Sequence, residues 1–209
     1  MFFQRDYILR MIEMMGDLMR RIREMMDDMA RMRFLEDTCQ KHTGLSLAAA
    51  ESLSAQSLEE LLQPMPRLLV SEILFIRAES FSLPAGEKEA LLHKSLHLLA
   101  SLWEEGPLCG LRAERLLALK AQLLPRLNAQ ELMNCARFLG EAEQYADMED
   151  ALFQAAELLP PGPQREALCG EGAMLLEQAA KAPPKALAFA RTGNGELLQS
   201  AQELRALGH

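Results

Sequence analysis

The sequence is poor in the residues that build β-sheets. Valine occurs once, at Val70, and the aromatic share is 5%, so leucine, alanine and methionine supply most of the apolar side chains. β-branched and aromatic residues favour strands, whereas leucine, alanine and methionine favour helices. The composition therefore predicts an all-α protein. With 209 residues and 49% apolar residues, the chain is long enough to bury one packed core, with or without an appendage.

Clusters of basic residues are also missing. The net charge is −8, with a pI near 5.1. Proteins that track nucleic-acid phosphates need grouped lysine and arginine, so we expect no nucleic-acid partner. Residues 1–35 carry seven arginines and six acids, a balance of +1, and the remainder carries −9. Such a balanced segment is typical of a solvated helix face.

Long apolar runs and paired cysteines are absent as well. No stretch without Asp, Glu, Lys or Arg is longer than nine residues, the length of 42–50, which is too short to span a bilayer. The opening "MFFQRDYILR" mixes both charges, unlike a signal peptide. The four cysteines form no C-x-x-C pair and are typical of free thiols in a reducing compartment. The sequence therefore predicts a cytoplasmic location.

Methionine is abundant, and eight of the thirteen lie in residues 11–32. A helix predicted over 5–36 carries apolar residues at alternating steps of three and four, and charged residues fill its other face. The seam consists of Ile8, Met11, Met15, Leu18, Ile22, Met25, Met29 and Met32. This is a coiled-coil heptad pattern. A helix of about 30 residues is about 45 Å long, so part of the seam should contact another copy of the chain or a protein partner.

Two other uses of the seam compete with protein contact. Met-x-x-Met spacing could offer thioethers to Cu(I), but no His or Cys accompanies it, and adaptable packing explains the same spacing. A helix lying on a membrane surface would gain from Phe2 and Phe3 and lose from the six acids. A membrane-surface adaptor is therefore the alternative to protein docking. Residues 1–40 are interpreted as the long amphipathic helix and residues 41–209 as a helical-hairpin domain.

The body of the chain alternates apolar helical patterns with prolines. Ser57 with Glu60, and Asn128 with Glu131, have the form of capping boxes. Helices are predicted near 46–53, 57–63, 66–82, 86–104, 110–125, 128–143, 147–159, 164–181, 183–192 and 195–207.

Residues 129–162 resemble a tetratricopeptide repeat, a thirty-four-residue helical hairpin. The pattern consists of Leu132, Cys135, Ala136, Leu139, Tyr145, Met148, Leu152, Ala155 and Pro160. Leu132 stands at the signature Trp position and Ala136 at the usual Gly, so the match is partial. The resemblance implies a right-handed superhelix of hairpins whose groove contacts peptides. In that geometry, Asn134 and Arg137 lie on the side of the helix that faces the peptide.

Three stretches also resemble an uncharacterised bacterial family of helical-repeat proteins. They are "RDYILRMIEMMGDLM", "SLEELL" and "FLGEAEQYADMEDALFQAAE", and the sharpest marker is the opening motif Asp6, Tyr7, Ile8, Arg10, Ile12 and Glu13. The family carries no known activity, so the resemblance implies a helical fold in a bacterial cytoplasm and no particular chemistry.

Catalytic and metal-binding patterns are weak. His93 and His97 share a helix face and could hold Zn²⁺ with Cys39, His42, Glu104 or Cys109. Lys94, however, follows the first histidine where a metalloprotease has Glu. No G-x-S-x-G occurs, and "TGNG" lacks phosphate-loop spacing. We therefore expect a non-enzymatic interaction or scaffold protein, a homo-oligomer or bound to a protein partner, without cofactor, metal or catalytic residues.

Overall fold

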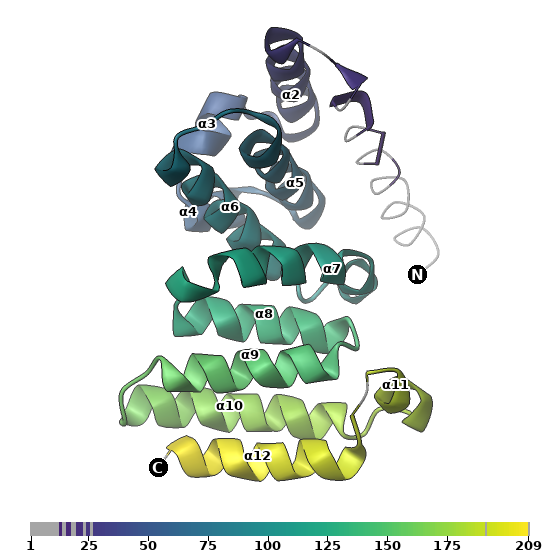
Figure 1. The fold of residues 1–209 in the computed structure, drawn as a ribbon, viewed down its shortest axis with the longest axis vertical. Helices are drawn as coiled ribbons and strands as arrows, with labels where there is room; N and C mark the ends of the chain where they lie inside the picture. The colour runs from purple at the N-terminus through teal and green to yellow at the C-terminus, as the bar shows by residue number, and fades with distance from the viewer. Residues whose placement is uncertain are drawn as a thin grey trace. The chain divides into compact units, whose positions relative to one another are not determined.

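The computed structural model describes residues 13, 16–17, 20–22, 24–25, 27–190 and 192–208. Regular structure in this part is entirely helical, with eleven α-helices and one 3-10 helix packed as consecutive antiparallel pairs. The helices are α2 (Asp28–Thr43), α3 (Leu47–Ser52), α4 (Ala55–Leu61), α5 (Pro64–Ser80), α6 (Ala85–Ala100), α7 (Gly106–Leu123), η1 (Leu124–Arg126), α8 (Ala129–Glu141), α9 (Tyr145–Glu157), α10 (Pro163–Ala179), α11 (Pro184–Phe189) and α12 (Asn194–Gly208). The all-α prediction is confirmed. The chain divides into two compact units, Met1–Leu102 and Trp103–His209 (Figure 1).

Local capping explains where the helices begin. The predicted capping box of α8 is confirmed: Glu131 N donates to Asn128 Oδ1 at 3.0 Å, and Asn128 N donates to Glu131 Oε2 at 2.9 Å. The box predicted at Ser57 is wrong, because Ser54 is the cap and accepts from Ser57 N at 3.0 Å. Prolines stand within the first two positions of α5, α7, α10 and α11, where no backbone donor is needed.

The helix predicted over 5–36 is interrupted at Asp27. Asp27 has extended backbone (φ −99°, ψ 123°), and its carboxylate accepts from the backbone N–H of Met29 and Ala30, so it caps a new helix. That helix, α2, continues to Thr43 and ends at Gly44, whose φ of 77° is a left-handed C-cap. The boundary predicted between residues 40 and 41 lies inside α2.

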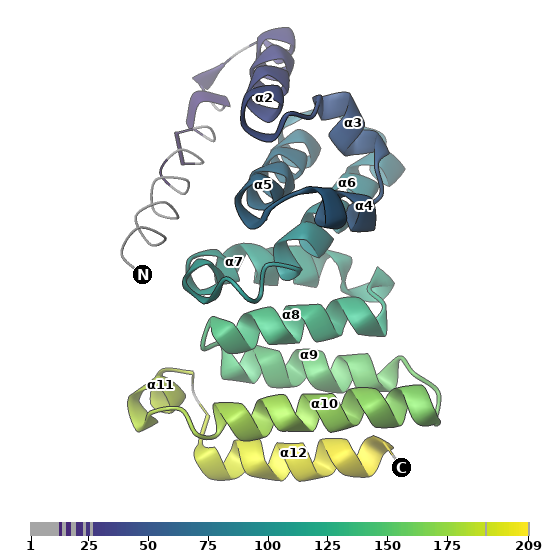
Figure 2. The same cartoon turned by 180° about the vertical axis from the view of Figure 1, so that it is seen from behind.

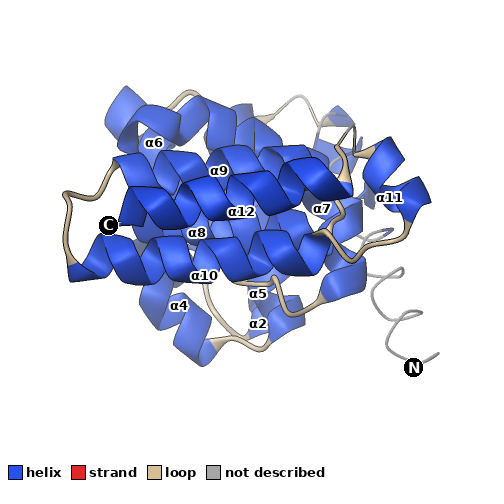
Figure 3. Cartoon of the chain, turned by 90° about the horizontal axis from the view of Figure 1, so that it is seen from below, coloured by secondary structure: helices blue, strands red, loops and turns tan. Residues whose placement is uncertain are grey.

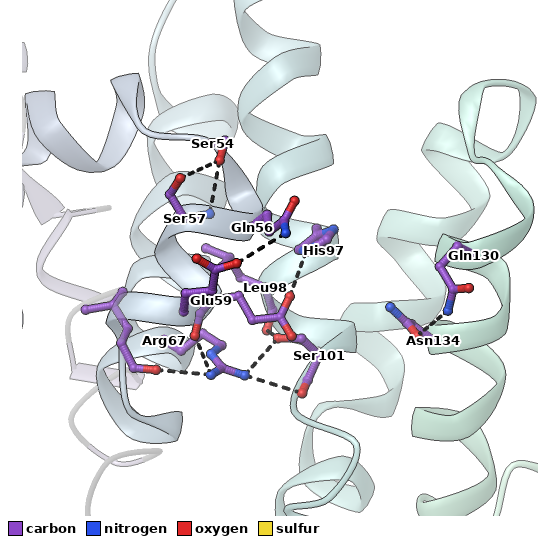
Figure 4. Close-up of polar contacts among 12 residues, drawn as sticks. Ser54, Gln56, Ser57, Glu59, Arg67, His97, Leu98, Ser101, Gln130 and Asn134 are labelled. Atoms are coloured by element: carbon purple, nitrogen blue, oxygen red, sulfur yellow. Dashed lines mark hydrogen bonds and ion pairs between the residues drawn. The ribbon is translucent and has the colours of Figure 1, made fainter.

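The first unit is organised around the hairpin of α5 and α6. Ser71 and Ser95 allow close approach, and each hydroxyl donates to the carbonyl of the other at 2.8 Å. Arg67 Nη2 donates to the carbonyls of Glu59 and Leu62 at 2.7 and 3.1 Å, which satisfies the C-terminal end of α4 (Figure 4). The Arg67 side chain thus links the short helix α4 to the α5–α6 hairpin.

The second unit is a stack of antiparallel helices. The α8–α9 and α10–α12 hairpins are its two most closely packed pairs, and α7 packs against α8 (Figure 2). Figure 3 shows α10 and α12 side by side, with α11 at one end of the pair. Small residues permit this packing: a Cβ on Gly172 would lie 2.7 Å from Leu204 Cδ2 and 3.0 Å from Leu152 Cδ2. Three helices therefore meet at Gly172.

Candidate binding groove

Two hollows of the second unit lie along α8 and α10. The first, about 520 Å³, is bordered by the N-terminal turns of both helices, including Gln130 and Gln164. The second, about 560 Å³, is bordered by their C-terminal ends, including Gly140 and Ala179. Glu171 lines both hollows. We call the pair of hollows the α8–α10 groove, since together they follow the two helices from one end to the other.

A chain of polar contacts joins the two hollows. Asn134 Oδ1 accepts from Gln130 Nε2 at 3.2 Å and from Arg137 Nη1 at 2.8 Å; Figure 4 shows the Gln130 contact. Arg137 Nε in turn donates to Glu171 Oε1 at 3.0 Å, and Nη2 pairs with the same oxygen. The guanidinium also lies 5.6 Å from the ring centroid of Trp103. Within the described part of the chain, the amide nitrogen of Asn134 has no hydrogen-bond partner.

The C-terminal hollow carries an excess of carboxylates. Glu141, Glu143 and Glu171 line it, against Arg137 and Lys181. Arg137 is already paired with Glu171, and both helices end here, so their terminal carbonyls add partial negative charge. Glu143 holds the left-handed backbone of the α8–α9 turn, with φ of 57°. The hollow is therefore electronegative.

The pKa of Tyr145, which lines this hollow, is raised. Burial raises the pKa of its phenol, and the carboxylates of Glu143 and Glu141 raise it further. The phenol is favoured in its neutral form, so its contribution to stability is present below the ordinary tyrosine pKa of 10.0. It is lost as the pH rises through the higher pKa of the folded state.

The Glu141→Gln/Glu143→Gln double variant should lower the pKa of Tyr145, because two charges that oppose the phenolate are removed. The titration is followed by the ultraviolet absorbance of the phenolate in a Tyr7→Phe background, which leaves one tyrosine. Glu114→Gln/Glu157→Gln, at two exposed positions that line neither hollow, is the charge-matched control. An equal shift in both variants would show that net charge, and not the hollow, sets the value.

The residues predicted for the heptad seam are only partly described. Ile8, Met11, Met15 and Leu18 lie outside the described residues. Ile22 is buried, Met25 and Met32 are half-buried, and Met29 is 65% exposed. Because α2 starts at Asp28, Met25 precedes that helix while Met29 and Met32 belong to it. Whether the seam contacts a partner stays a prediction.

The histidine pair considered for zinc has other contacts. His97 Nε2 lies 2.9 Å from Glu59 Oε2, which joins α6 to α4 (Figure 4). His93 borders a separate hollow of about 340 Å³ beside Lys94 and Gly86. Among the residues the structure describes, no group of three or more His, Cys, Asp and Glu side chains could hold a metal ion.

All four cysteines are buried free thiols. Burial raises the pKa of each, to about 12 at Cys109 and Cys135. At Cys109 the carboxylate of Glu141 adds to the effect of burial. Because the thiolate is the reactive form, thiols held neutral in this way behave as small apolar packing residues.

Of the two residues expected on the peptide-facing side, Arg137 lines the C-terminal hollow, whereas Asn134 lines neither hollow and contacts Gln130 and Arg137. The sequence did not predict Glu171 or Trp103 as lining residues. One available signal was the spacing: Arg137 and Glu171 are thirty-four residues apart, as are Cys135 and Cys169. A thirty-four-residue period places the two members of each pair at equivalent points of α8 and α10, the first helices of successive hairpins. Trp103 precedes α7 and carried no local pattern.

Comparison of the chain with protein-family models, with curated proteins and with solved structures found no match. The resemblance to a bacterial helical-repeat family therefore has no support beyond the sequence motifs. In the opening motif, Glu13 is the one residue that the structure describes. Within the described residues, no helix is both long enough and apolar enough to cross a membrane. The chain is an all-helical protein without a recognised family.

Proposed function

We propose that this chain is a non-enzymatic interaction protein whose second unit binds an extended peptide segment of a partner in the α8–α10 groove. The observation that carries the proposal is the groove itself: two hollows that meet at Glu171 and are joined by the contacts of Gln130, Asn134 and Arg137. Side-chain amides can donate to and accept from a peptide backbone, and a free donor remains on Asn134.

A tetratricopeptide-like arrangement of the second unit supports this function. Helix α10 begins thirty-four residues after α8, and the buried Cys135, Phe138 and Leu139 correspond to the buried Cys169, Gly172 and Ala173. The second helices are related less regularly, since α12 begins forty-nine residues after α9. The short helix α11 lies in the longer connection. In such arrays the first helices of successive hairpins form the peptide-binding face.

We infer that the N-terminal seam serves oligomerisation or partner docking. Met29 supports this role, because an apolar side chain that is 65% exposed on the first turn of α2 remains available for contact. Methionine suits a tolerant contact surface, since its unbranched thioether adapts to different neighbours.

Selection of random dodecapeptides displayed on phage against the full chain tests the groove. Enriched peptides should bind the Gln130→Ala/Asn134→Ala variant at least about tenfold more weakly, a loss of about 1.4 kcal/mol. Gln122→Ala, which removes an exposed amide from α7 away from both hollows, should bind as the native chain does. Failure to enrich any peptide, or binding that ignores both amides, would contradict the proposal.

A further inference from the structure

We propose that the C-terminal hollow of the α8–α10 groove receives an arginine or lysine side chain of the bound peptide. This inference rests on the proposed function and adds the chemistry of the ligand to it. It starts from the lining of the hollow, which combines carboxylates at its rim with apolar walls from Leu175, Ala182 and Pro183.

The hollow has unused capacity for a cation. Two nitrogens of Arg137 donate to Glu171 Oε1 and the third donates to Asn134 Oδ1, so the guanidinium is not free to bind an anion. Glu141 and Glu143 are exposed and have no ion-pair partner within the described residues. The second oxygen of Glu171 likewise accepts no hydrogen bond there, and its side chain is 41% exposed. Three carboxylate groups therefore remain able to accept from a ligand.

The one other cation of the hollow does not reverse this balance. Lys181 follows the end of α10, where a positive charge interacts favourably with the terminal carbonyls. The hollow as a whole keeps one more carboxylate than cations. The pKa of Tyr145 is raised chiefly by burial, and the carboxylates of Glu143 and Glu141 add to that shift.

The shape of the hollow favours a long side chain. Arginine and lysine carry an apolar stem of three or four methylene groups below the charged head. The stem can pack on Leu175, Ala182 and Pro183, while the head reaches the carboxylates. The Trp103 ring also lines the hollow, but the Arg137 guanidinium already lies 5.6 Å from its centroid, so the carboxylates are the groups that attract the ligand's charge. A neutral or acidic side chain could pack on the apolar walls of the hollow but would form no ion pair with its carboxylates.

Trp103 makes the test direct, because it is the single tryptophan of the chain and lines the hollow. The probe is the peptide acetyl-Ala-Ala-Ala-Arg-Ala-Ala-Ala-amide, compared with versions in which citrulline or glutamate replaces arginine. Binding to the full chain is read from Trp103 emission and from the NMR signal of its indole N–H. The arginine peptide should saturate both with a Kd on the order of 1 mM, and the citrulline peptide should bind at least about fivefold more weakly.

Two double variants of equal net charge distinguish the effect of the carboxylates in the hollow from the effect of overall charge. Glu141→Gln/Glu143→Gln should weaken the arginine peptide about fivefold or more, whereas Glu114→Gln/Glu157→Gln, with the same net charge, should leave it unchanged. Equal binding of the citrulline or glutamate peptide, equal loss in both variants, or no response of either Trp103 signal would overturn the inference. Selected peptides that bind through Gln130 and Asn134 but contain no arginine or lysine would overturn it too. That last result would leave the proposed function standing.

Discussion

Replacing Gly172 by alanine should destabilise the second unit, whereas the same replacement at Gly170, two residues earlier in α10, should stabilise it. A Cβ on Gly172 would lie 2.7 Å from Leu204 Cδ2 and 3.0 Å from Leu152 Cδ2, and both leucines are fully buried on other helices. A Cβ on Gly170 would meet nothing within 4 Å. Overpacking costs about 1–3 kcal/mol, while alanine gains about 1 kcal/mol over glycine inside a helix.

The expected result is a net loss of up to about 2 kcal/mol for Gly172→Ala and a gain of up to about 1 kcal/mol for Gly170→Ala. Urea unfolding followed by Trp103 emission reports on the second unit, since the chain has no other tryptophan. Gly172→Leu should lose more than Gly172→Ala, because its larger side chain must displace the same two leucines. If Gly172→Ala stabilised the unit, Leu152 of α9 and Leu204 of α12 would be able to move away from α10 at little cost in free energy.

Gly172 also shows why the repeat was hard to see in the sequence. At the equivalent position thirty-four residues earlier stands Phe138, which is fully buried. In the first hairpin the Phe138 side chain occupies this position. In the second hairpin Gly172 has no side chain, and Leu152 and Leu204 occupy the adjoining space. Sequence similarity is lost while the helix positions persist. The α11 insertion then shifts the second helices from a spacing of thirty-four to forty-nine.

Helix positions could be predicted because their signals are local. Prolines and Asn128 act within one turn, and the helices predicted beyond residue 45 correspond to observed ones with ends displaced by a few residues. The two failures at helix starts are also local. Ser54 and Ser57 are equally good caps, and Asp27 lies in a run of charged residues where an N-cap resembles a solvated helix face.

The groove could be predicted only in part, because it depends on contacts between helices distant in sequence. Arg137 was placed by analogy with peptide-binding repeats, but its ion pair with Glu171 requires α10 to lie beside α8. Glu141 and Glu143 belong to no sequence pattern, because they line a hollow only where the end of α8 lies beside the end of α10. Composition predicts the class of fold, and packing decides which surface residues share a hollow.

Leu35→Ala should cost the first unit about 2–5 kcal/mol, and Met29→Ala in the same helix should cost almost nothing in dilute solution. Leu35 is fully buried and lies outside the predicted seam, whereas Met29 belongs to the seam and is 65% exposed. Removing a buried leucine loses its transfer free energy and leaves a cavity. Removing an exposed side chain leaves the core of its unit unchanged. Far-ultraviolet circular dichroism during urea unfolding measures both losses.

The dependence on protein concentration decides what Met29 does. If the seam joins two copies of the chain, the native chain becomes more stable at higher concentration, because association favours the folded state. Met29→Ala should then lose that dependence, while Leu35→Ala should keep it from a lower starting stability. If the stability of the native chain and of both variants is independent of protein concentration, the seam does not join copies of this chain under those conditions. A large loss for Met29→Ala in dilute solution would mean that its side chain packs within its own chain, contrary to its exposure in the structure.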